Sequence, residues 1–183
     1  LRPLNEAEVR DLAARIVADG EVQAVAVVLL FSYANPAHEL RVRDIFAEVA
    51  PGLPVSVSYD VLPRWKEYER ASTTIADAAL KPVVSEQMRA VKSRLADAGI
   101  GARVSAIRSN GGEMTLDAAA AAPVQLALSG PTGGVVAAKR LADLIGEPSL
   151  VTLDMGGTST DCSTILSGKE SFTTDFEIEW GVP

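Results

Sequence analysis

The apolar positions at the start of the chain follow first a helical and then a strand-like spacing. A helix is expected between Asn5, which suits an N-cap, and Gly20, which suits a helix stop. Its apolar face comprises Val9, Leu12, Ala13, Ile16 and Val17. Residues 22–31 are almost wholly apolar, which is typical of a strand that is buried on both faces of a parallel sheet.

A second helix and a second strand follow directly. Asn35 and Pro36 suit an N-cap and a first helical position, and Pro51-Gly52 is expected to end the helix. The buried stripe of this helix is expected to contain Val42, Ile45, Phe46 and Val49. With a strand over residues 53–58, the β-α-β order predicts two parallel strands joined by a right-handed crossover, and hence an α/β fold.

Helical spacing dominates the next forty residues. One helix is predicted from Tyr68, Ala71, Ile75 and Ala79, and a second from Val84, Met88, Val91 and Leu95. Pro82 is expected to separate these two helices. We place a boundary between two half-domains near Leu80, which divides the chain into residues 1–80 and residues 81–183.

A short strand and a glycine-rich turn come next. Residues 103–108 are expected to form the strand, and Ser109-Asn110-Gly111-Gly112 is expected to form the turn. Thr115 then suits the N-cap of a short alanine-rich helix that ends at Pro123.

A second glycine-rich turn is predicted at Ser129-Gly130-Pro131-Thr132-Gly133-Gly134. It leads into a helix over residues 135–145, whose small and apolar residues predict burial. The free amides at the start of this helix, with Gly133 and Gly134 beside them, suit an anion or a close backbone contact. A plain helix entry with glycines for close packing is the alternative.

The most distinctive segment is residues 150–161. Val151 and Leu153 suit a buried strand, and Asp154 lies at its end. Gly156 and Gly157 let the backbone turn tightly and approach a ligand, and consecutive amides in such a turn form an anion-binding concavity.

Polar side chains complete this segment. Thr158 and Thr160 add hydroxyl donors, and Asp161 adds a second acid. Asp154 suits Mg²⁺, which prefers oxygen ligands. The segment therefore predicts a site for phosphate and magnesium, and the alternative is a hairpin whose glycines only serve the turn. A strand over residues 162–166, a turn at Gly168-Lys169 and a returning strand over residues 171–174 are expected to follow.

Composition narrows the class of protein. The net charge is −7, which argues against a general binder of nucleic acid or of anionic membranes. The longest apolar run is too short to span a bilayer. With one cysteine no disulfide can form within the chain, so a cytoplasmic location is expected. The chain begins with Leu and its end shows no terminal cap, so a piece of a longer protein is expected.

Four segments in this order resemble the hydantoinase A/5-oxoprolinase family of ATP-using enzymes. They are Glu67-Tyr68-Glu69-Arg70 with Ser72-Thr73-Thr74, Ser109 to Gly112, Ser129 to Gly134, and Asp154 to Asp161. The resemblance implies an actin-like fold, in which two ribonuclease-H-like halves with mixed sheets flanked by helices hold a nucleotide between them. Residues 1–80 would end the first half, and residues 81–183 would begin the second half with its phosphate-binding hairpin.

The same resemblance implies a function. ATP would phosphorylate the oxygen of a cyclic amide, such as a hydantoin or 5-oxoproline, so that water opens the ring. Asp154 would organise Mg²⁺, Gly156, Gly157 and Thr158 would hold phosphates, and Thr160 and Asp161 would support the loop or orient water. Gly133 and Gly134 would lie beside the nucleotide. The implied partners are a small cyclic amide and a hydantoinase B-like subunit or domain, in an oligomer.

Two alternatives remain open. Related family members are ATP-using subunits of acetone or acetophenone carboxylases, and more distant actin-like proteins are nucleotide switches without a small substrate. The family's first phosphate loop and its adenosine segment are missing from this sequence. The chain alone is therefore expected to be inactive.

Three other features are assigned structural roles or left open. Cys162 is expected to be a buried packing residue, because no base lies near it in the sequence. His38 is expected at the surface or in a cap. Glu67, Glu69 and Arg70 could bind substrate at the junction of the halves or form a salt-bridged face.

Overall fold

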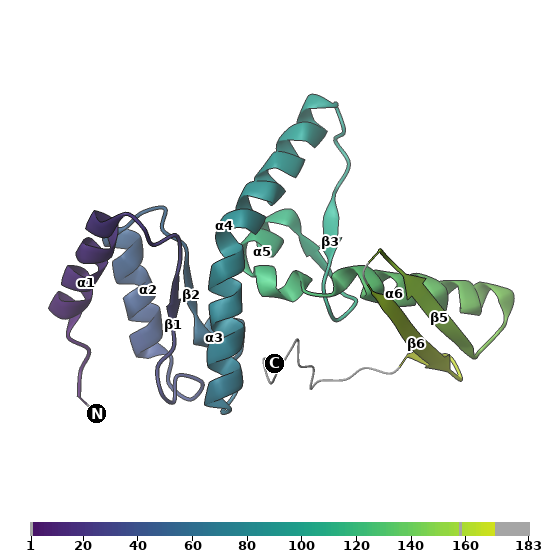
Figure 1. The fold of residues 1–183 in the computed structure, drawn as a ribbon, viewed down its shortest axis with the longest axis horizontal. Coiled ribbons are helices and arrows are strands. Elements are labelled where there is room, and N and C mark those ends of the chain that lie inside the picture. The colour runs from purple at the N-terminus through teal and green to yellow at the C-terminus, as the bar shows by residue number, and fades with distance from the viewer. Residues whose placement is uncertain (1, 158, 171–183) are drawn as a thin grey trace.

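The computed structural model describes residues 2–157 and 159–170. It confirms the α/β class and contains both parallel and antiparallel strand pairs, distributed over three small sheets (Figure 1). The elements in chain order are α1 (Glu6–Asp19), β1 (Val25–Val27), α2 (Ala37–Val49), β2 (Val55–Val57), α3 (Ser58–Val61), α4 (Glu67–Asp97), β3 (Ser105–Ile107), β4 (Glu113–Thr115), α5 (Leu116–Ala121), the 3₁₀ turn η1 (Pro123–Leu126), α6 (Ser129–Ile145), β5 (Leu150–Met155), β6 (Thr160–Leu166) and β7 (Lys169–Glu170).

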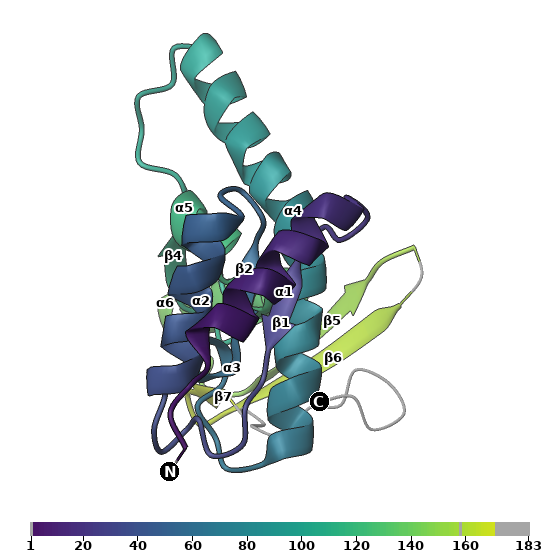
Figure 2. The same ribbon diagram turned by 90° about the vertical axis from the view of Figure 1, so that its left-hand side faces the viewer.

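The N-terminal unit is a three-layer arrangement around β1 and β2. The two strands are parallel and pair Val25 with Val55, as the β-α-β order predicts. Helices α1 and α2 cover one side and α4 covers the other (Figures 1 and 2). The core between them contains Ala13, Val27, Val42, Phe46, Ala50 and Val57. Burial of this apolar surface holds the layers together.

Local capping signals are confirmed in this unit. The side chain of Asn5 accepts a hydrogen bond from the Glu8 amide (3.4 Å), and Gly20 ends α1 with a φ of 71°. Helix α2 begins one residue later than predicted, and Asn35 Oδ1 accepts from the Ala37 amide (3.1 Å).

Strand β1 is much shorter than the predicted strand over residues 22–31. The backbone of Leu29 bonds to side chains instead of to a strand. Its amide donates to Glu39 Oε1 (2.7 Å), and its carbonyl accepts from Arg70 Nη2 (3.0 Å). The chain therefore turns away, and Leu30 and Phe31 are exposed.

Helix α4 is one continuous helix of 31 residues, so the predicted interruption at Pro82 is wrong. Proline removes one backbone donor, but tertiary contacts hold the turn before it. Lys81 Nζ donates to the Val55 carbonyl (2.9 Å), and Asp77 accepts from Ser56 Oγ (2.7 Å). The boundary proposed near Leu80 lies inside α4, so both predicted parts of the chain share this helix.

The second part of the chain contains two hairpins and α6. Strands β3 and β4 pair antiparallel, and Thr115 caps α5 by accepting from the Ala118 amide (3.1 Å), as predicted. Strand β6 begins two residues earlier than predicted, and its turn into β7 lies at Ser167-Gly168. The strand predicted over residues 171–174 lies outside the described residues.

Helix α6 differs from the prediction at both its start and its burial. It begins at Ser129, so the segment Ser129 to Gly134 is helical and not a turn. Ala142 is buried, but Leu141, Leu144 and Ile145 are exposed, which contradicts the predicted burial. One side of α6 packs on β3, β5 and β6, and the other side is uncovered by the residues that the structure describes. No helix within residues 2–157 and 159–170 is both long and apolar enough to cross a bilayer.

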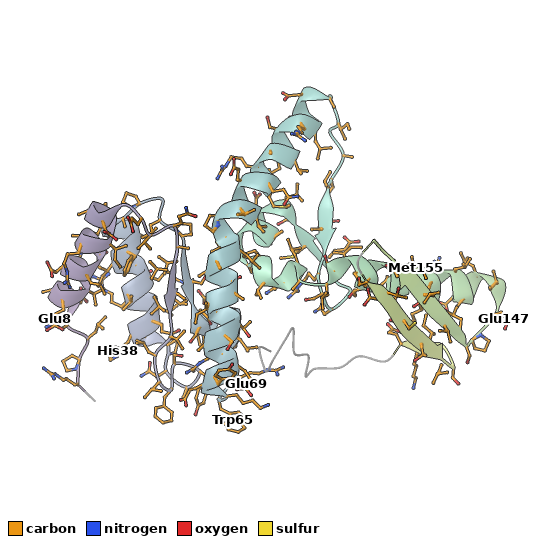
Figure 3. The ribbon with its side chains drawn as sticks, in the orientation of Figure 1. Glu8, His38, Trp65, Glu69, Glu147 and Met155 are labelled. Atoms are coloured by element: carbon orange, nitrogen blue, oxygen red, sulfur yellow. The ribbon has the colours of Figure 1, made fainter. Side chains whose placement is uncertain are left out.

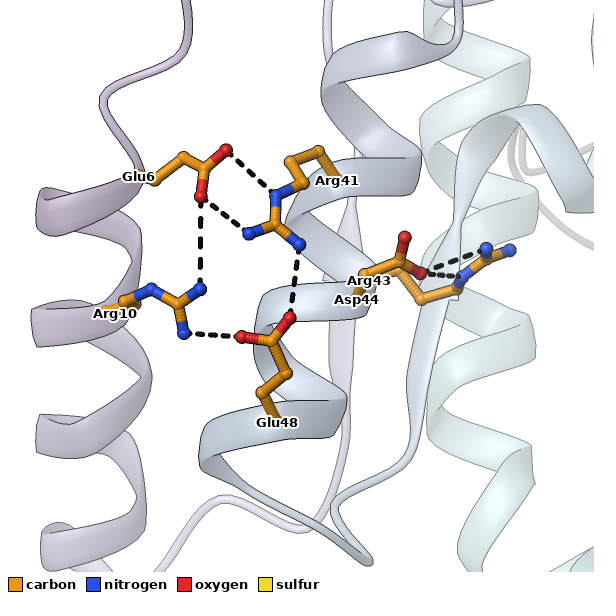
Figure 4. A network of polar contacts seen from close by, with 6 residues as sticks. All are labelled: Glu6, Arg10, Arg41, Arg43, Asp44 and Glu48. Atoms are coloured by element: carbon orange, nitrogen blue, oxygen red, sulfur yellow. Dashed lines mark hydrogen bonds and ion pairs between the residues drawn. The ribbon is translucent and has the colours of Figure 1, made fainter.

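Charged side chains link α1 to α2 at the surface (Figure 4). Arg41 Nη2 lies 2.6 Å from Glu6 Oε2, and Arg10 Nη1 lies 2.6 Å from Glu48 Oε2. The hydrogen bond from Arg41 lowers the pKa of Glu6, and the hydrogen bond from Arg10 lowers the pKa of Glu48.

Acidification is expected to loosen α1 from α2. A carboxylate with a lowered folded pKa contributes stability that is present above its unfolded pKa, 4.5, and is lost as the pH falls through the folded value. Hydrogen exchange in residues 6–19, corrected for the intrinsic pH effect, should therefore accelerate below pH 4.5. A Glu6→Gln/Glu48→Gln variant should lack this acceleration. An identical pH profile in that variant would contradict the assignment.

Candidate functional site

Helix α6 brings together the three glycine-containing segments that the sequence singled out. The Ser109–Gly112 turn packs on its first turns, the segment Ser129 to Gly134 forms those turns, and the β5–β6 hairpin packs along the same helix. Figure 3 shows Met155, at the end of β5, above the N-terminal half of α6, with Glu147 at the opposite end. These segments, far apart in sequence, therefore meet at one place.

The Ser109–Gly112 turn is stabilised by one hydrogen bond within it and by hydrogen bonds to η1 and α6. Within it, Asn110 Oδ1 accepts from the Gly112 amide (3.0 Å) and Gly111 has a φ of 81°. Ser109 donates through its amide to the Gln125 carbonyl in η1 (2.8 Å). The Ser109 carbonyl accepts from Thr132 Oγ1 in α6 (3.1 Å). This predicted turn is confirmed, and it joins η1 to α6.

Asp154 and Asp161 are directly opposite each other in the β5–β6 hairpin. Side chains of such a cross-strand pair point to the same face, with Cβ atoms about 4.5–5.5 Å apart, and like charges there repel. Ile165 is fully buried on this face, so it is the face that α6 covers. Both acids are exposed at its open end. The hairpin thus places two carboxylates directly opposite each other on one face.

Thr160 does not join these acids. It pairs with Met155, and alternation along the strands places both on the opposite face. Thr158 lies outside the described residues. Of the hydroxyl residues that the sequence proposed, Thr160 therefore points away from Asp154 and Asp161.

Gly133 and Gly134 lie inside α6, so their amides belong to the helical hydrogen-bond ladder and are not free as predicted. Their missing side chains are what matters. A Cβ at Gly133 would lie 3.1 Å from Ile107 Cδ1, and one at Gly134 would lie 4.0 Å from Asp154 Oδ2. Gly133 therefore permits close packing on β3, whereas Gly134 leaves space beside the Asp154 carboxylate.

Gly156 and Gly157 begin the loop of the hairpin. The Gly156 amide donates to the Ser159 carbonyl (2.9 Å), so it is not free for an anion. Neither glycine has a positive φ, and a Cβ on either would meet no atom closer than 3.7 Å. Neither backbone conformation nor crowding among the described residues requires glycine here.

This donor set fits a hydrated magnesium ion with phosphates. Mg²⁺ is commonly held by one or two carboxylates, with water and phosphate oxygens as its other ligands. Asp154 and Asp161 supply two carboxylates, and no group of three His, Cys, Asp or Glu side chains forms a metal cluster within residues 2–157 and 159–170. The arrangement can therefore hold a cation only together with ligands from outside this part of the chain.

Replacing Gly134 with alanine separates packing from ligand binding. Alanine favours a helix over glycine by about 0.5–1 kcal/mol, and the new Cβ has room, 4.0 Å from Asp154 Oδ2. We expect a more stable protein by urea unfolding, with weaker binding of Mg²⁺ and nucleotide because the methyl group fills the space beside Asp154. Gly130→Ala is the matched control, since a Cβ there meets no atom within 4 Å. Equal binding by both variants would contradict this role of Gly134.

Three side chains on the outer face of the β5–β6 hairpin are exposed, although the sequence predicted that they are buried. Val151 and Leu153 are 70% and 63% exposed, although their sequence suited a buried strand. Cys162, opposite Leu153, is also exposed and is not a buried packing residue. The predicted strand exists, but α6 covers only its other face. His38 is exposed, as expected.

The segment around Arg70 is structural. Arg70 is fully buried, and its guanidinium donates to Ser32 Oγ and to the Leu29 carbonyl (both 3.0 Å). Glu67 is exposed, and Glu69 is paired with Lys66 at 3.5 Å. Within the described residues, a solvated and structural role therefore fits this segment better than a substrate site, although only Glu69 of the three forms a salt bridge.

Two buried acids were missed by the sequence analysis. Glu39 accepts from the amides of Leu29 and Tyr59, and Asp77 accepts from Ser56 and from the Val124 amide. Asp77 lies off the apolar stripe predicted for its helix, whereas Glu39 adjoins the stripe of α2, three residues before Val42. The available signal was a pair of serines in and just after β2, Ser56 and Ser58, which supply hydroxyl partners to Asp77 and Glu39.

Comparisons with known proteins agree on one family. The family model described as Hydantoinase/oxoprolinase matches residues 70–182, and the model of its N-terminal region matches residues 1–50. The chain is 31% identical to the caprolactamase subunit alpha of Pseudomonas jessenii, over 94% of this chain and 25% of that protein. It is 32% identical to the 5-oxoprolinase of Saccharomyces cerevisiae, over 90% of this chain and 12% of that protein.

A solved structure gives the same result. The nucleotide-free structure of acetone carboxylase, described as part of the mechanism of ATP-dependent acetone carboxylation, superposes with a TM-score of 0.74 at 32% identity. The match covers 91% of this chain and 24% of that chain. The chain thus spans about a quarter of the length of the caprolactamase subunit and of the acetone carboxylase chain.

Proposed function

Because this chain belongs to the hydantoinase/oxoprolinase family, we propose that it is the phosphate- and magnesium-binding part of an enzyme that uses ATP to open a cyclic amide. The observation that carries this proposal is the pair of exposed carboxylates, Asp154 and Asp161, held opposite each other beside the space at Gly134. An actin-like fold and an ATP-using family are consistent with this role.

The proposed roles follow from the chemistry of the side chains. ATP would supply a phosphoryl group to the amide oxygen, which would make the amide carbon a better electrophile for attack by water. Phosphoryl transfer requires mainly positioning and charge neutralisation. Asp154 would hold Mg²⁺, Asp161 would share the ion or orient water, and the space above Gly156 and Gly157 would admit the phosphates.

A partner subunit is part of this proposal. The caprolactamase relative is described as a subunit alpha, and the acetone carboxylase and acetophenone carboxylase relatives are also described as subunits. We propose a hydantoinase B-like partner subunit or domain for the protein that contains this chain, and a small cyclic amide as its substrate.

A carboxylase subunit is the second candidate, because the acetone carboxylase structure superposes as described above. Phosphate release by the whole protein with its partner, measured on a panel of hydantoin, 5-oxoproline, a lactam, acetone and acetophenone, separates the two. We expect release that depends on a cyclic amide. Release that depends on a ketone and bicarbonate would favour the carboxylase. Release that ignores every small molecule but responds to a protein would favour a nucleotide switch.

A further inference from the structure

Asp77 is a fully buried carboxylate in the middle of α4, and it contacts two other elements, β2 and η1, and a lysine of its own helix. Its Oδ2 accepts from Ser56 Oγ in β2 (2.7 Å) and lies 3.4 Å from Lys81 Nζ. Its Oδ1 accepts from the Val124 amide in η1 (3.2 Å). Because each oxygen faces a different part of the molecule, this one carboxylate links the N-terminal unit to η1. We call the contacts of Asp77 with Ser56 and Val124 the clasp.

The contact to η1 continues toward the candidate site. Gln125, the next residue in η1, accepts through its carbonyl from the Ser109 amide (2.8 Å) and from Ser109 Oγ (3.1 Å). The Ser109 carbonyl in turn accepts from Thr132 Oγ1 in the first turns of α6 (3.1 Å), a hydroxyl that shares its one proton with the Leu128 carbonyl at the same distance. Hydrogen bonds, joined through the backbone from Val124 to Gln125, therefore lead from β2 through Asp77 and the Ser109–Gly112 turn to α6. Helix α6 approaches Asp154 at Gly134.

We propose that Asp77 is a positioning residue: it fixes the Ser109–Gly112 turn and the start of α6 relative to the parallel strands of the N-terminal unit. Its importance for the reaction rests on the function proposed above. A misplacement of about 1 Å in a reacting geometry can cost a hundredfold in rate. A clasp that sets this geometry should therefore affect the coupling of ATP use to ring opening.

Asparagine is the sharpest test at this position. It has the same shape as aspartate but carries one oxygen and one NH₂ group. The NH₂ group must face either the Val124 amide or the Lys81 ammonium, and both are donors. With the NH₂ group toward Val124, Asp77→Asn loses the link to η1. With the NH₂ group toward Ser56 and Lys81, the Ser56 hydroxyl can still accept a hydrogen bond, and the contact with Lys81 is lost.

The matched control is Asp117→Asn. Asp117, in α5, pairs with Lys92 of α4 (2.7 Å), but its side chain is 80% exposed. Exposed ion pairs of this kind contribute little to the stability of the folded protein. Both variants thus replace an aspartate that contacts a lysine of α4. Asp77 belongs to the clasp, and Asp117 does not.

Hydrogen exchange in the whole protein is the first readout. Losing one hydrogen bond should speed exchange in peptides that cover residues 105–115 and 123–132 by about three- to tenfold in Asp77→Asn, with no change in Asp117→Asn. If Asp77→Asn does not fold, Ser56→Ala removes one partner without changing charge, and about twofold faster exchange is expected. Unchanged exchange in these peptides would overturn the proposal.

The second readout is the number of ATP molecules hydrolysed per ring opened. This ratio is independent of how much protein is folded, so a merely structural role would not change it. We expect it to rise at least twofold in Asp77→Asn, and an unchanged ratio would leave Asp77 a structural residue and overturn its positioning role. If the wild-type protein shows no hydrolysis that depends on a cyclic amide, the proposed function fails, and the exchange measurement still decides whether Asp77 fixes the turn.

Discussion

Replacing Asp154 with asparagine is expected to lower Mg²⁺-dependent ATP turnover of the whole protein by about 10²- to 10³-fold. Asparagine keeps the shape of the side chain but removes one of the two negative charges that face each other across the hairpin. With Asp161 as the one remaining carboxylate of the pair, the ion would face one negative charge from the protein instead of two. Phosphate release at saturating ATP and varied Mg²⁺ measures the effect.

The same substitution should not weaken the fold. Like charges directly opposite in a hairpin repel each other, so removing one should leave the unliganded protein as stable or slightly more stable. Mg²⁺ with nucleotide should raise the thermal midpoint of the wild-type protein and have little effect on Asp154→Asn. Asp143→Asn, an exposed acid of α6, is the control and should retain both responses. Normal turnover in Asp154→Asn would remove Asp154 from the site.

The parts of the fold that could be predicted are those decided within a few residues. Asn5 bonds to Glu8 and Thr115 bonds to Ala118, so both caps depend on contacts three residues apart. The stripe of Val42, Ile45 and Phe46 depends on helical periodicity alone, and all three residues are buried. Local sequence contains the whole cause of these features.

The failed predictions have causes far away in the sequence. Strand β1 ends because Glu39 and Arg70 take both backbone groups of Leu29, from 10 and 41 residues away. Helix α4 continues through Pro82 because contacts to β2 and η1 hold the turn before it. No pattern within a window of the sequence contains these partners.

The candidate site lies between these two cases. The sequence identified Asp154, Asp161 and the glycines, and a hairpin with residues 156–159 as its loop pairs the two acids directly. The same count places Thr160 on the other face, so its position was available from the sequence once the register was fixed. The bonded amide of Gly156 and the helical state of Gly133 and Gly134 were not, because a glycine-rich segment is compatible with both a turn and a close-packed helix.

A directed chain of hydrogen bonds links two of the buried charges, those of Glu39 and Arg70. Ser58 Oγ donates to Glu39 Oε1 (2.7 Å), so its only proton is used. Ser32 Oγ, 3.0 Å away, must then donate to Ser58, and it accepts from Arg70 Nη1 (3.0 Å). The positive and negative charges are thus joined through two hydroxyl groups, and the Tyr33 ring lies 5.6 Å from the guanidinium carbon.

Replacing Glu39 with alanine is therefore expected to destabilise the protein by about 3–5 kcal/mol, because the buried Arg70 loses its counter-charge. The amides of Leu29 and Tyr59 also lose their acceptor. Glu39→Gln should cost less, about 1–3 kcal/mol, since one oxygen remains to serve part of the network. Urea unfolding with a constant m-value measures both effects. The exposed Glu8→Ala is the control and should change stability little.

The double variant Glu39→Leu/Arg70→Leu tests whether the chain acts as one unit. Each single change leaves the other charge buried and uncompensated, whereas the double change removes both charges together. Its cost should therefore fall below the sum of the two single costs by about 0.5–3 kcal/mol. Strictly additive costs would show that Glu39 and Arg70 stabilise the fold independently. In that case the strand end at Leu29 would depend on two separate side chains and not on one connected network.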